Sequence, residues 1–64
     1  MGEYREAQIS EVRMIIGLAD KQMRIAIEDL EKTPQRAASA LRNAISKLQV
    51  AATKAESIDS LTFV

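Results

Sequence analysis

Two heptad stripes constrain this chain more than any other feature of its sequence. Apolar residues recur at alternating steps of three and four through residues 9–30, and again through residues 37–58. The first stripe consists of Ile9, Val12, Ile16, Ala19, Met23, Ala26 and Leu30, and the second of Ala37, Leu41, Ala44, Leu48, Ala51, Ala55 and Ile58. Such a repeat, held over more than three heptads, is typical of helices that pack along a coiled-coil-type seam. The sequence therefore predicts an all-α fold built from two helices.

The two stripes are separated by the dipeptide Thr33-Pro34. Threonine is a favoured N-cap, and proline is favoured at the first helical position, where a backbone N–H would lack a partner. The residue before a proline also avoids helical geometry. We expect a single domain over residues 1–64, with a first helix at about 3–32, a turn at 32–34, a second helix at about 34–57 and a C-terminal tail at 58–64.

The two stripes complement each other if the chain folds back at this break, so that facing residue numbers sum to 67. In the first six layers from the turn a larger side chain then faces an alanine, as in the pair Met23 and Ala44. This alternation lets helix axes approach to about 8 Å, and it favours an antiparallel αα-hairpin. The alternative is one long helix kinked at Pro34 and paired with a second chain, although a proline inside a helix costs about 3 kcal/mol.

Two helices of this length cannot enclose a core. A chain of 64 residues buries only about 60% of the surface that its unfolded form exposes, and no Cys is present to form a disulfide. Beside the stripes lies an apolar flank made of Ile27, Ala38, Ile45 and Ala52. We therefore expect a homo-oligomer, with a dimer favoured, in which two hairpins pack through this flank into a four-helix bundle.

A further apolar stripe, which we call the outer stripe, consists of Met14, Leu18 and Ile25. On a helical wheel it lies on a different side of the first helix from the heptad stripe, so one neighbouring helix cannot cover both. We expect the outer stripe, together with Ile27 and Ile45, to make oligomer contacts or to bind another protein.

The composition offers little for catalysis. The chain contains no Cys and no His, which supply most nucleophile–base pairs and most structural zinc ligands. Its two glycines are isolated and form no phosphate-binding loop. We expect no enzymatic activity, no metal site and no cofactor.

The charge and hydropathy of the chain bear on its partners. Nine basic and nine acidic residues cancel, whereas nucleic-acid binders usually carry an excess of positive charge. No apolar run approaches the roughly 18 residues of a membrane span, and the lack of Cys fits a reducing compartment, so we expect a cytoplasmic protein. The sequence predicts a non-enzymatic protein–protein interaction module. The alternative is a small dimeric nucleic-acid-binding regulator that uses Arg36, Lys47 and Lys54 of the second helix.

Overall fold

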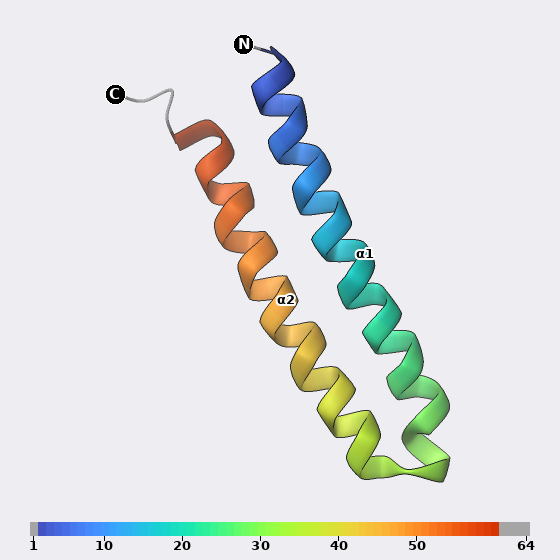
Figure 1. The fold of residues 1–64 in the computed structure, drawn as a ribbon. Helices are drawn as coiled ribbons and strands as arrows, with labels where there is room; N and C mark the ends of the chain where they lie inside the picture. Colours follow the sequence, from blue (N-terminus) through green and yellow to red (C-terminus); the bar gives the residue numbers. More distant parts are fainter. Residues whose placement is uncertain (1, 61–64) are drawn as a thin grey trace.

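In the computed structural model, which describes residues 2–60, the chain is an antiparallel hairpin of two α-helices (Figure 1). Helix α1 spans Gly2–Lys32 and helix α2 spans Pro34–Ser60, with no strand among the described residues. The hairpin that the heptad stripes predict is confirmed. Pro34 begins a new helix and does not kink one long helix.

A single residue, Thr33, separates the two helices. Its backbone N–H donates to the carbonyl oxygen of Asp29 at 2.7 Å, which completes the last turn of α1. Its own carbonyl accepts the N–H groups of Arg36 at 2.9 Å and Ala37 at 3.1 Å, which opens the first turn of α2. No described residue takes a positive φ. The chain therefore reverses without the glycine that tight turns often require.

Helix α2 extends to Ser60, three residues beyond the end that the sequence suggests. Residues 58–60 are weaker helix formers, but no Gly or Pro interrupts them. The hydroxyl of Ser57 donates to the carbonyl oxygen of Lys54 at 2.8 Å within this last part of the helix. The remainder of the expected tail, residues 61–64, lies outside the described residues.

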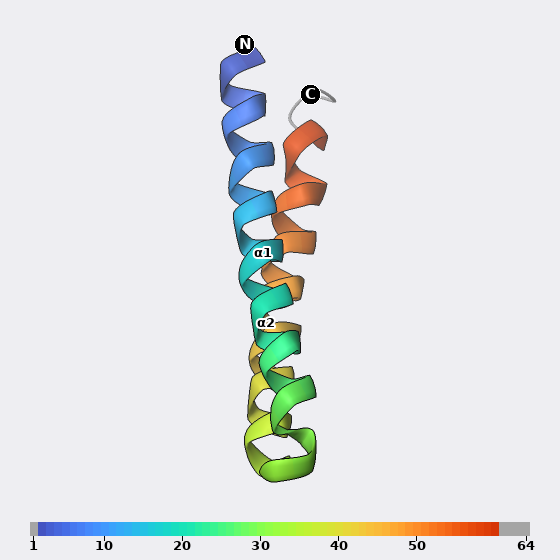
Figure 2. The same ribbon diagram turned by 90° about the vertical axis from the view of Figure 1, so that its right-hand side faces the viewer.

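Small side chains form the contact between the helices. The buried apolar residues are Val12, Ala19, Ala26, Ala37, Ala40, Ala44 and Ala51. All except Ala40 belong to the predicted heptad stripes. Because an alanine presents only a methyl group, the two helices can lie close together along their length (Figures 1 and 2).

The hairpin is a single layer of two helices. Its Cα positions extend over 50 × 19 × 9 Å. The turn lies at one end, and the first residues of α1 and the last residues of α2 lie at the other, which we call the open end (Figure 1). A layer one helix thick leaves two broad faces to solvent, and these two faces differ in chemistry.

Candidate interaction surfaces

One broad face of the hairpin is apolar and takes its residues from both helices. We call it the apolar face; α1 contributes Ile9, Ile16, Met23, Ile27 and Leu30, and α2 contributes Ala38, Leu41, Ile45, Leu48, Ala52 and Ala55. Helical spacing places all of them on the same side of the line where the helices meet. Six large side chains are between 39% and 75% exposed: Ile16, Ile27, Leu30, Leu41, Ile45 and Leu48. The hairpin thus buries alanines and leaves its bulkiest apolar groups outside.

The apolar face contains about half of each heptad stripe. Stripe members spaced by seven, at positions 12, 19 and 26 of α1 and 37, 44 and 51 of α2, lie on the contact line and are buried. The members between them point to one side of that line, because the two positions of a heptad seam flank the direction of the neighbouring helix. Ile27 and Ile45, which the sequence suggested as oligomer contacts, lie next to them. The flank and the outer halves of the stripes therefore form one continuous surface.

The apolar face is hollowed near the turn. Met23, Ala26, Ile27 and Leu30 of α1 and Leu41 of α2 line a shallow depression of about 280 Å³. None of these side chains carries a hydrogen-bond donor, so the depression suits an apolar side chain from another molecule.

Charged side chains border the apolar face along both outer edges. The α1 edge carries Arg13, Asp20, Arg24 and Glu31, and the α2 edge carries Arg42 and Glu56, all exposed. Asp20 Oδ2 and Arg24 Nε form an ion pair at 3.0 Å, which contributes little to stability because it is exposed to solvent. An apolar centre with a charged rim is the usual anatomy of a protein–protein interface.

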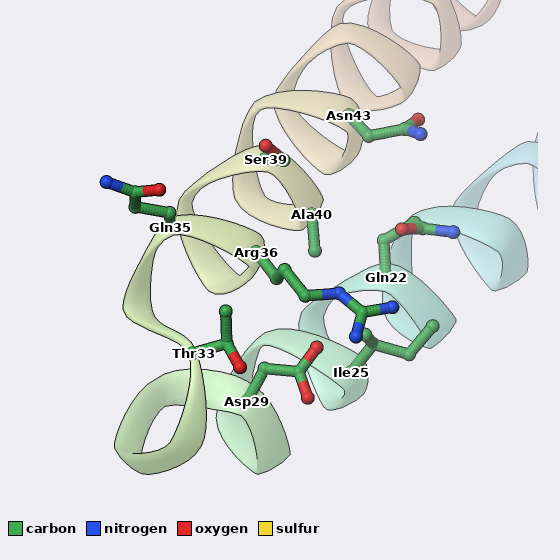
Figure 3. Close-up of a pocket in the computed structure, with 9 residues that line it drawn as sticks. All are labelled: Gln22, Ile25, Asp29, Thr33, Gln35, Arg36, Ser39, Ala40 and Asn43. Atoms are coloured by element: carbon green, nitrogen blue, oxygen red, sulfur yellow. The ribbon is translucent and has the colours of Figure 1, made fainter.

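The opposite face of the hairpin is polar. Lys54 Nζ and Glu11 Oε1 form an ion pair at 2.9 Å that joins the two helices. Nearer the turn is a hollow of about 480 Å³ with a mixed, mostly polar lining, drawn in Figure 3. The Arg36 side chain extends there from α2 toward α1, where Gln22, Ile25 and Asp29 line the same hollow (Figure 3). The middle of this face is therefore polar, while Leu18 and Ile25 of α1 and Val50 of α2 leave some exposed apolar surface beside it.

Arg36, Lys47 and Lys54, the residues of the nucleic-acid alternative, all lie on the polar face. The structure brings them to one side of α2 but mixes them with carboxylates of α1. Lys54 is paired with Glu11, Asp29 shares the hollow with Arg36, and Lys47 is half-buried. A strip of cations facing phosphates would need few neighbouring carboxylates, so this arrangement gives the nucleic-acid alternative little support.

The outer stripe lies on α1, toward the polar face and away from α2. Met14, Leu18 and Ile25 are 66%, 46% and 36% exposed, and Ile25 also lines the hollow of Figure 3. Around the axis of α1, the outer stripe lies about 100–140° away from the direction of α2, on the side opposite the apolar face. One partner helix therefore cannot contact both the outer stripe and the apolar face.

Sequence reasoning did not place Ala40 in the contact between the helices. This residue is buried and packs with Ala26 and Ala37. It follows Ala37 by three residues and precedes Ala44 by four, which was the available signal that it shares their side of α2.

Within residues 2–60, no group of three or more Asp, Glu, His or Cys side chains lies close enough together to hold a metal ion. Over the same residues, neither helix has an apolar stretch of the length that a membrane crossing requires. No protein-family model, curated protein sequence or solved structure matches this chain. A functional conclusion therefore rests on the surfaces of the hairpin itself.

Proposed function

We propose that the chain is a non-enzymatic protein–protein interaction module that works as a homodimer, in which two hairpins pack through their apolar faces into a four-helix bundle. The observation that carries this proposal is the apolar face, which is continuous across both helices and bordered by charge. A small regulator, an adaptor or an assembly subunit acts through surfaces of this kind.

The free energy of burial favours association. Six large side chains of the apolar face are 39–75% exposed in the hairpin, whereas complete burial of an Ile or Leu side chain contributes about 1.5–3 kcal/mol. A chain of 64 residues without disulfides has few other sources of stability. Covering this face with a second helical layer adds the core that two helices alone cannot enclose.

The dimensions of the face suit a stable dimer. The hairpin is 50 Å long and 19 Å wide by its Cα positions, an area on the order of 900 Å², while a standard interface buries about 800 Å² on each partner. Coiled-coil-type packing across this area would leave the two polar faces in solvent. The proposed bundle therefore has an apolar interior, and its outer surface is polar apart from the outer stripe and Val50.

The outer stripe gives the dimer a surface for another protein. Met14, Leu18 and Ile25 stay exposed when a second copy covers the apolar face, because they point to the other side of α1. The stripe occurs once on each copy, so the proposed dimer presents it twice.

Two neighbouring residues of α2 provide a matched test. Ile45 belongs to the apolar face, and Ser46 lies on the exposed back of the same helix. Ile45→Glu places a charge in the proposed interface, so we expect light scattering to give the mass of one chain for this variant. Ser46→Glu makes the same change in charge one residue away, and we expect it to keep the mass of a dimer. A dimer that tolerates Ile45→Glu as well as Ser46→Glu would contradict the proposal.

A further inference from the structure

The apolar face is uneven along its length, because its bulk is concentrated near the turn. Five of its large residues lie in that half, namely Met23, Ile27, Leu30, Leu41 and Ile45, together with Ala38. Toward the open end α1 contributes Ile9 and Ile16, and α2 contributes only Ala52 and Ala55. Two faces packed with their turns at the same end would crowd the turn end and underfill the open end. If the two turns lie at opposite ends, the bulkier half of each face packs against the less bulky half of the other, and the interface is filled more evenly.

On α2, the two large residues of the apolar face that precede Leu48 have small counterparts at nearly equal distances after it. Leu41 and Ala55 lie seven residues before and after it, and Ile45 and Ala52 lie three before and four after it. If two α2 helices run antiparallel about this point, Leu41 of one copy faces Ala55 of the other, and Ile45 faces Ala52. The pairing repeats the large-against-small packing that joins α1 to α2 within one hairpin.

The charged rim of α2 has nearly the same centre. Arg42 and Glu56 lie seven residues before and after Gln49, and both are exposed. In the reversed arrangement each Arg42 comes level with Glu56 of the other copy, which gives two ion pairs of opposite charge. With the turns together, α2 would lie beside α1 of the other copy, and Arg42 would come level with Arg24. That arrangement sets the like-charge pair Arg42 and Arg24 beside the opposite pair Glu56 and Arg13, whereas the reversed arrangement pairs both charges of the α2 rim with opposite charges.

Helix α1 shares this centre. The Glu11–Lys54 ion pair and the depression lined by both Ala26 and Leu41 show that facing residue numbers sum to about 67, so Gln49 is level with Leu18. Ile9 and Ile27 of the apolar face lie nine residues on either side of Leu18. A single two-fold axis through this level therefore pairs Ile9 with Ile27 on α1, a pair of large residues, and Arg42 with Glu56 on α2. It also brings Arg13 level with Arg24 of the other copy, whose charge is offset by its ion pair with Asp20.

We infer that the occupant of the apolar face is a second copy of this chain in reversed orientation, with the turns at opposite ends of the bundle and α2 beside α2. The inference rests on the proposed self-association and adds its orientation and register. It gives the bundle two identical outer stripes that run in opposite directions, and thus two equivalent sites for another protein.

The chain has no cysteine of its own, so engineered cysteines report the orientation without interference. The two cysteines of Ile45→Cys/Ala52→Cys are two helical turns apart on one helix and cannot join within one chain, since a disulfide needs Cα atoms within about 7 Å. In the reversed bundle we expect mild oxidation to link two copies through this pair on a non-reducing gel. Arg13→Cys/Glu56→Cys, on opposite edges of the hairpin, is the matched pair for the arrangement with the turns together, and we expect it to stay unlinked.

Rim charges give a second readout that leaves the packing intact. In the reversed bundle Arg42→Glu faces Glu56 of the other copy, so we expect the dimer Kd to rise roughly tenfold, and Arg42→Glu/Glu56→Arg to restore it to within about twofold. With the turns together, Arg42→Glu would face Arg24 and lower the Kd.

The possible outcomes separate the two proposals. A wild-type chain that stays monomeric overturns the self-association itself. A wild-type dimer that is linked through Arg13→Cys/Glu56→Cys, or that is tightened by Arg42→Glu, overturns only the orientation. A dimer in which neither cysteine pair links, and in which Arg42→Glu leaves the Kd unchanged, also overturns the orientation.

Discussion

At the contact line between α1 and α2, five alanines have at most 4% of their surface exposed: Ala19, Ala26, Ala37, Ala44 and Ala51. Each stands where the other helix comes closest, and a methyl group is what the space holds. The larger side chains of the same layers lie toward the apolar face. The small side chains at these positions therefore determine how closely the helices pack, and they leave the larger side chains of the same layers on the apolar face.

The buried position of Ala44 predicts that added volume there is costly. Ala44→Leu would push α1 and α2 apart, and we expect it to lower the free energy of unfolding by about 1–3 kcal/mol. Ser46→Leu adds similar volume on the exposed back of α2 and should change stability by less than about 0.5 kcal/mol. Urea denaturation at one protein concentration compares the two. Equal effects from both variants would show that the alanines are not at the closest contact.

Gly17 lies in the interior of α1, where glycine is less favourable than alanine by up to about 1 kcal/mol. A Cβ built on Gly17 meets no atom within 4 Å. We therefore expect Gly17→Ala to raise the melting temperature and to leave the mass in solution unchanged. If Gly17→Ala weakened self-association instead, the backbone of a partner would approach at Gly17.

For the helices, the sequence predicted the hairpin and most of the buried residues. The heptad stripes and Thr33-Pro34 carry enough local information for that, because spacing fixes the inner side of each helix and proline marks a helix start. The sequence did not predict that the larger stripe residues would all point toward the same face of the hairpin, as Ile16, Leu30, Leu41 and Leu48 do. A heptad pattern predicts which stripe of a helix faces its neighbour. The face toward which the larger residues of that stripe point depends on how each helix is rotated about its own axis in the folded hairpin.

The outer stripe belongs to one helix, and its role can be separated from that of the apolar face. Leu18→Asp/Ile25→Asp should preserve the helix content and the dimer mass, because these residues point away from the proposed interface. Circular dichroism and light scattering measure both properties. A monomeric double variant would mean that the outer stripe, and not the apolar face, carries self-association.

For the molecule as a whole, balanced charge and the mixing of cations with carboxylates on the polar face predict weak binding to nucleic acid. We expect binding to duplex DNA or RNA at physiological salt to be weaker than about micromolar, since phosphate contacts dominate such affinities. Fluorescence anisotropy with a labelled duplex tests this expectation. Tight, salt-sensitive binding that is lost on replacing Arg36, Lys47 and Lys54 would favour the nucleic-acid regulator instead.

Self-association can be measured most directly on the unmodified chain by sedimentation equilibrium over a range of concentrations. We predict a mass approaching twice the 7.1 kDa of one chain, accompanied by a melting temperature that rises with concentration because only the folded dimer gains from association. A mass of 7.1 kDa at every concentration, together with a melting temperature that does not change, would contradict the four-helix bundle.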